Sequence, residues 1–143
     1  MTPFKQLLVD DCVRTAIGCL LDMPPFTVPH FFEGITSETS ADDVKEVWHR
    51  IDRWLAEHGL AHISFGFPGF ETMADLMAAM KHTNPNRYYL LFGSSPVGDH
   101  VVVCLNDEMI CDPSWTNNGL IGPSSAGVWT VVTLISSRML AAA

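Results

Sequence analysis

Four runs of β-branched and aromatic residues in the second half of the chain constrain its fold more than any other feature. Turn-forming residues separate the runs, which occupy residues 88–92, 100–105, 109–111 and 128–135. Successive strands joined by short turns pair in antiparallel order, and Asn106-Asp107 suits a hairpin turn. The pattern therefore predicts an antiparallel sheet in the C-terminal part of the chain.

The first half of the chain instead shows helical spacing of its apolar residues. Helices are expected over residues 12–22, 41–59 and 71–80. A carboxylate of Asp10 or Asp11 is expected to cap the first helix, and residues 65–70 are expected to form a Phe-rich loop. Because the helices precede the strands, we expect an α+β fold with N-terminal helices packed on a C-terminal antiparallel sheet.

Length and composition restrict the domain organisation and the partners. With 143 residues, 48% of them hydrophobic, the chain suits a single domain over residues 1–140, and residues 141–143 are expected to be a disordered tail or a cloning remnant. A net charge of −8 disfavours nucleic acid as a partner. No apolar run is long enough to cross a membrane, and the N-terminus lacks a secretory pattern. We therefore expect a cytoplasmic protein with reduced cysteines and no membrane partner.

Three residues with complementary chemistry are expected to meet in this fold. Cys12 lies at the predicted start of the first helix, where the helix dipole can lower the pKa of a thiol. His100 opens one predicted strand and Asp112 ends the next, so a turn at Asn106-Asp107 places them almost opposite each other. A carboxylate that orients an imidazole beside a nucleophile is the arrangement of a catalytic triad. The spacing therefore indicates a Cys-His-Asp site.

The order of these residues resembles that of papain-like cysteine peptidases. Gln6 precedes Cys12 by six residues, a His opens a strand, and Asp-Pro follows the next strand, as in the peptidase domains of bacteriocin-processing exporters. The segments CVRTAIGCLLDMP, VPHF, YYLLFGSSPVGDHVVV and MICDPSWTNNGL are also similar to small uncharacterised phage and bacterial proteins with the same order. One departure is Val13, where the exporter peptidases often carry Gly.

The resemblance implies a papain-like fold and a role for each matching residue. Cys12 would attack a carbonyl, His100 would act as general base and acid, Asp112 would orient His100, and Gln6 would donate to the oxyanion. Trp115 would shield the His-Asp pair. The substrate would be a peptide or protein cleaved at a peptide, isopeptide or related acyl bond, with no metal and no organic cofactor.

The same scaffold is also compatible with a second function that involves no catalysis. A phage-encoded papain-like protein can bind and inhibit a host protein in the host cytoplasm, with the Cys-His-Asp set vestigial. The apolar segments 24–32 and 65–70 are compatible with such a binding surface. The sequence leaves the oligomeric state and the choice between the two functions open.

The other three cysteines have a structural interpretation. Cys19 follows Cys12 by seven residues and therefore lies near the same helix face, where it is expected to pack in the core. Cys104 and Cys111 lie on predicted strands and are expected to be near neighbours, but their spacing matches no zinc-binding motif.

Overall fold

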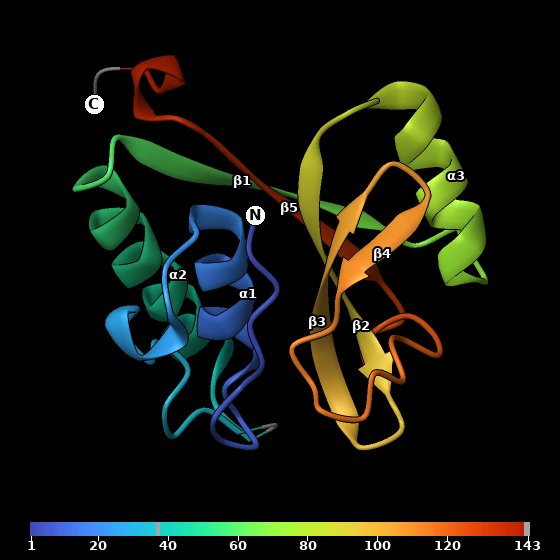
Figure 1. Cartoon of the computed structure of the whole chain (residues 1–143). Coiled ribbons are helices and arrows are strands. Elements are labelled where there is room, and N and C mark those ends of the chain that lie inside the picture. Colours follow the sequence, from blue (N-terminus) through green and yellow to red (C-terminus); the bar gives the residue numbers. More distant parts are fainter. Residues whose placement is uncertain (37, 142–143) are drawn as a thin grey trace.

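A computed structural model describes residues 1–36 and 38–141 of the chain (Figure 1). Residues 142 and 143, part of the expected tail, lie outside the described residues. The helices are α1 (Cys12–Leu21), α2 (Ala41–Ala56) and α3 (Met73–Thr83), with short 3-10 helices at Pro25–Thr27 and Ser137–Met139. The strands are β1 (Leu60–Phe67), β2 (Tyr88–Ser95), β3 (Gly98–Leu105), β4 (Glu108–Cys111) and β5 (Trp129–Ser136). None of the helices in the described ranges combines the length and apolarity needed to cross a bilayer.

The five strands form one antiparallel sheet with helices on both of its sides. Its strand order is β1-β5-β2-β3-β4, and α1 and α2 lie on one side while α3 lies on the other (Figure 1). Alternate strand residues enter the two cores: Leu90 packs in the core with α1 and α2, whereas Leu91 packs in the core with α3. This confirms the predicted α+β class, with N-terminal helices on a largely C-terminal antiparallel sheet.

The expected loop at residues 65–70 is partly wrong. Residues 65–67 belong to β1, which pairs with β5 over eight residues along one edge of the sheet. Phe67 turns toward Phe70, and their ring centroids lie 6.1 Å apart beside the core of α3. Phe65 remains 53% exposed on the edge strand. The segment thus closes part of the core and extends the sheet.

The start of α1 is held differently from the expected capping. Asp11 is the residue before the helix, but its carboxylate makes no capping hydrogen bond. It is fully buried, forms an ion pair with the Arg14 side chain and accepts a hydrogen bond from the Leu7 backbone N–H. The guanidinium of Arg14 therefore takes the place of the helix N–H groups as the main partner of this carboxylate.

Candidate active site

A β-bulge decides which residues of β4 face His100. The hairpin pairs Leu105 with Glu108, so regular pairing would place Asp112 opposite Val101 and on the other face from His100. The register shifts by one residue, and Val103 pairs with Cys111. Asp112, which follows β4, therefore shares the sheet face of His100.

His100 and Asp112 form the central interaction of the site. The Nε2 atom of His100 lies 2.7 Å from Oδ1 of Asp112, with 10% and 1% of the two side chains exposed. Burial opposes ionisation of Asp112. Hydrogen bonds from His100 and from the backbone N–H groups of Gly119, at 2.8 Å, and Ser114, at 2.9 Å, outweigh that effect and hold the pKa of Asp112 below its usual range. Asp112 is a buried carboxylate whose Oδ1 accepts two of these bonds and whose Oδ2 accepts the third.

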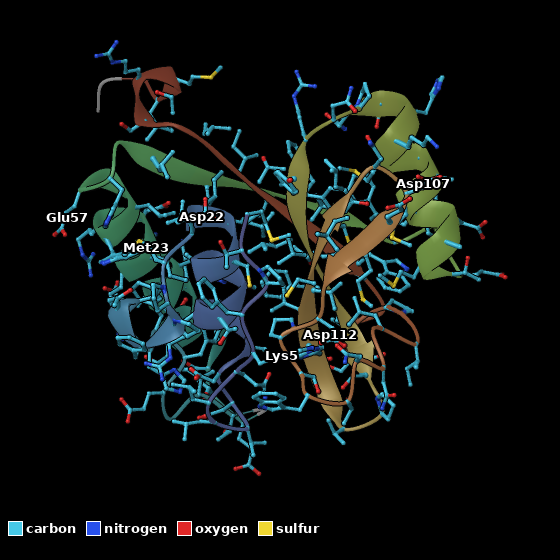
Figure 2. All side chains as sticks on the ribbon, in the orientation of Figure 1. Lys5, Asp22, Met23, Glu57, Asp107 and Asp112 are labelled. Atoms are coloured by element: carbon cyan, nitrogen blue, oxygen red, sulfur yellow. The ribbon has the colours of Figure 1, made fainter. Side chains whose placement is uncertain are left out.

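The N-terminal segment holds the loop that carries Asp112. The ammonium of Lys5 donates to the carbonyls of Asp112, at 2.8 Å, and Ser114, at 2.9 Å, and also to the Asn117 side chain. The Gln6 N–H donates to the Pro113 carbonyl at 2.9 Å. Lys5 and Asp112 are labelled side by side in Figure 2. The sequence interpretation missed Lys5, because a lone lysine near a chain terminus carries no local signal of a partner more than a hundred residues away.

Cys12 is the first residue of α1, but its thiol does not have the expected acidity. Burial raises the pKa of Cys12 to about 11, against the opposing effect of the N–H groups of Val101, Cys12 and Val13. The negative charge of Asp11 adds to the rise. The expected lowering by the helix start is present, but loss of solvent outweighs it, so the expectation of an acidic thiol is wrong. The thiol is protonated at neutral pH.

All four residues named for catalysis line one cavity. Its volume is about 750 Å³, and its lining includes Gln6, Cys12, His100 and Asp112. Because Asp112 occupies Nε2 of His100, Nδ1 is the ring nitrogen left for another partner. The structure thus brings the base, the orienting acid and the thiol of the sequence prediction to one solvent-connected space.

The side-chain amide of Gln6 donates its hydrogen bonds to the loop that follows it, not to the cavity. Its Nε2 group donates to the carbonyls of Leu8, at 3.0 Å, and Val9, at 3.1 Å, whereas its buried Oε1 has no hydrogen-bond partner in the described part of the chain. A flipped amide would set an oxygen against two carbonyls, so the observed orientation is the favourable one. To donate to an oxyanion, Gln6 would have to release one of these bonds.

Trp115 does not take the shielding position expected from the resemblance. Its side chain is 72% exposed and is absent from the cavity lining, and its Nε1 donates to the Gln6 carbonyl at 2.8 Å. Asp112 is nevertheless only 3% exposed, and its carboxylate accepts from the Ser114 and Gly119 N–H groups of the following loop. Trp115 joins the N-terminal segment to that loop.

The remaining cysteines do not form the expected neighbours. Cys104 packs in the core with α3, whereas Cys111 packs in the core with α1, on the other face of the sheet. The bulge explains the separation, because it changes the face to which Cys111 points. The partner of Cys111 is Cys19, which lies in the core as expected, with the two sulfur atoms 3.6 Å apart.

The function of this site has to be inferred from its geometry, because comparisons with other proteins give no match. No protein-family model, curated protein or solved structure matches this chain. Within residues 1–36 and 38–141, no group of three or more His, Cys, Asp or Glu side chains is arranged to hold a metal ion. The arrangement of thiol, imidazole and carboxylate is suited to nucleophilic attack on a carbonyl.

Proposed function

We propose that this protein is a papain-like cysteine hydrolase that cleaves a peptide, isopeptide or related acyl bond. The observation that carries the proposal is the shared cavity of Cys12, His100 and Asp112, in which the imidazole and the carboxylate already form a 2.7 Å hydrogen bond. These are the nucleophile, base and orienting group that acyl transfer requires.

The raised pKa of Cys12 determines how the nucleophile is generated. Because the thiol is protonated at neutral pH, its proton must leave as the sulfur attacks. Nδ1 of His100 accepts this proton, and the negative charge of Asp112 stabilises the imidazolium that results. A bond forms between Cys12 Sγ and the carbonyl carbon, and the carbonyl π electrons move to oxygen.

Collapse of this intermediate releases the first product. The electrons on oxygen re-form the carbonyl, the bond to the leaving amine breaks, and His100 returns the proton to that amine. Water then attacks the thioester with His100 again as base, and the acid product leaves Cys12. The cycle restores the thiol and the neutral imidazole without a cofactor.

Backbone and side-chain donors are available for the oxyanion. The N–H of Cys12 lies at the first position of α1, where it has no acceptor within the helix, and Gln6 lines the same cavity. One such donor contributes about 3 kcal/mol of transition-state stabilisation. Gln6 contributes only when substrate displaces one of its bonds to the Leu8 or Val9 carbonyl.

The cavity lining favours an apolar or uncharged segment of a peptide or protein. Val9 and Val97 both border the cavity and are both 95% exposed, so they stand at its mouth. Asp10 and Asp99 also line it, and among the described lining residues there is no Lys or Arg. An anionic acyl group would meet negative charge without a cationic partner.

Acylation by an activated ester tests the proposal directly. Treatment with p-nitrophenyl acetate should release nitrophenolate in a burst and add about 42 Da to the tryptic peptide 6–14, which contains Cys12. His100→Ala should slow this acylation by about 10²-fold or more. The matched control is His62→Ala, because His62 also bonds to a carboxylate, Asp52, at 2.6 Å but does not line the cavity. Equal acylation of the His100 and His62 variants would refute the mechanism.

Two observations favour the alternative of a binding protein with a vestigial site. The thiol of Cys12 is protonated and the donors of Gln6 are occupied, so neither group is poised for reaction in the free protein. A scaffold that binds and inhibits a host protein needs neither. If wild-type protein acylates no faster than Cys12→Ala, binding is the better interpretation.

A further inference from the structure

Two cysteines from distant parts of the chain meet outside the cavity. Cys19 lies in the second half of α1, and Cys111 is the last residue of β4. Their Sγ atoms are 3.6 Å apart although 92 residues separate them in the sequence. Neither sulfur belongs to the cavity lining, and the two side chains are 0% and 5% exposed. The contact is therefore an element of the core that the proposed reaction does not use.

The N-terminal segment gives this pair an asymmetric polar environment. The Phe4 N–H donates to Cys19 Sγ at 3.3 Å, and the Cys111 thiol donates to the Phe4 carbonyl at 3.6 Å. A hydrogen bond from Cys19 and then the nearby charge of Lys5 lower the pKa of Cys111 to about 7, despite its burial. The same hydrogen bond, followed by burial, raises the pKa of Cys19. Cys111 is the more exposed of the two side chains and lies near the charge of Lys5, so its sulfur is the one expected to react first.

We propose that Cys19 and Cys111 are a site of reversible oxidation, at which a peroxide converts the two thiols into a disulfide. The thiolate of Cys111 attacks one oxygen of hydrogen peroxide, so that an S–O bond forms, the O–O bond breaks and hydroxide leaves. The sulfur of Cys19 then attacks the sulfenic acid, an S–S bond forms, and the oxygen leaves as water. Two thiols and one peroxide give one disulfide and two waters, and a dithiol reductant reverses the reaction.

The disulfide would also change the proposed active site, a consequence that rests on the proposed function. Cys19 is on the helix that begins at Cys12, and Cys111 directly precedes Asp112. Bond formation shortens the 3.6 Å contact to about 2 Å, and closing this gap is expected to displace α1 and the end of β4 relative to each other. A displacement of about 1 Å is enough to reduce the efficiency of a positioned catalytic group by about 10²-fold. Oxidation is therefore expected to slow reactions at Cys12.

Peptide mapping of the native full chain tests the disulfide itself. The protein is exposed to hydrogen peroxide, remaining thiols are blocked with N-ethylmaleimide, and trypsin plus a Glu-specific protease separate all four cysteines, with cleavage after Glu108 dividing Cys104 from Cys111. The expected product joins the Cys19 peptide to the Cys111 peptide with a loss of about 2 Da. It should disappear in Cys19→Ser and Cys111→Ser and persist in the control Cys104→Ser. The proposal would be overturned if Cys111 accumulated as sulfinic acid while Cys19 carried N-ethylmaleimide, because Cys19 would then have remained a free thiol.

The effect on the active site has a separate measurement. The rate of Cys12 alkylation by iodoacetamide should fall about tenfold or more after oxidation and recover with dithiothreitol. In Cys111→Ser, peroxide treatment at the same dose should leave this rate nearly unchanged. A disulfide without any change in Cys12 alkylation would refute the coupling to the site. Because alkylation and mapping need no substrate, these results are independent of whether p-nitrophenyl acetate acylates the protein.

Discussion

Replacing Asp112 with Asn tests the interaction on which the site geometry depends most. The carboxylate accepts three hydrogen bonds: Oδ1 accepts from His100 and the Ser114 N–H, and Oδ2 accepts from the Gly119 N–H. An Asn side chain of the same shape has only one oxygen. At least one buried N–H group must therefore face the donors of the new amide.

The two amide orientations have different consequences. If the oxygen stays against His100 and Ser114, one bond is lost and the Gly119 N–H is left unpaired. If the amide turns over, it opposes the Ser114 N–H and forces the ring proton of His100 onto Nδ1, which can then no longer accept a proton. Both orientations leave one buried N–H group unpaired, and the first should prevail because it keeps the ring proton of His100 on Nε2. One buried unsatisfied donor costs about 1–3 kcal/mol, so Asp112→Asn should reduce the free energy of unfolding by about 2 kcal/mol at pH 7.

Acid sensitivity provides a second signature of the same carboxylate. Because the pKa of Asp112 is lowered in the folded state, its stabilisation is present above the unfolded pKa of about 4 and is lost as the pH falls through the folded-state pKa. Wild-type protein should therefore lose stability below about pH 4 more steeply than Asp112→Asn.

Urea unfolding followed by tryptophan fluorescence measures both effects. The matched control is Asp107→Asn, because Asp107 is also ionised but forms an exposed ion pair with Lys81 at 3.0 Å. Both aspartates are labelled in Figure 2. The control should leave the free energy of unfolding nearly unchanged. An Asp112→Asn variant as stable as wild type would show that the carboxylate does not organise the loop, and the argument for a preformed His-Asp pair would fail.

Three further perturbations have expected outcomes that urea unfolding can check. Lys5→Met removes an ammonium that donates to three acceptors, so it should reduce the free energy of unfolding by about 1–3 kcal/mol. The control Lys45→Met removes an exposed lysine and should not reduce it, and equal effects of the two substitutions would contradict the anchoring role of Lys5. Gly93→Ala should destabilise by about 1–3 kcal/mol because a Cβ there would lie 2.6 Å from a backbone oxygen and 2.7 Å from an indole carbon, while Gly69→Ala, with nothing within 4 Å, should be tolerated. Because the folded pKa of Cys12 is raised to about 11, stability should fall between about pH 9 and pH 11, and Cys12→Ala should reduce that slope.

The sequence predicted the three strands with several buried side chains and the short β4, but it missed β1. Strands β2, β3 and β5 each contribute several buried side chains, so their sequences are rich in β-branched or large apolar residues. In β1, Ala61 is the only buried residue, and polar or glycine residues occupy alternate positions. An edge strand that shields little of the core leaves a weak hydrophobic pattern, so only its pairing with β5 identifies it.

The acidity of Cys12 shows a limit of local reasoning. Position at a helix start is a local property, and it does act in the expected direction through the N–H groups of Cys12 and Val13. Burial depends on segments far away in the sequence, and its effect on the pKa is larger. Helix position alone therefore gives the location of the thiol without its protonation state.

The meeting of His100 and Asp112 was predicted correctly, but the reason lies in a feature that counting along the sequence does not reveal. Counting back from a turn at Asn106-Asp107 gives a register, and an error of one residue moves each side chain to the other face of the sheet. The bulge in β4 supplies that one residue, since Ile110 has no partner between the Met109 and Cys111 pairs. The same shift places Cys111 against Cys19 instead of beside Cys104. A single inserted residue thus accounts for both the proposed catalytic pair and the proposed redox pair, which is why the two sites lie next to each other at the end of β4.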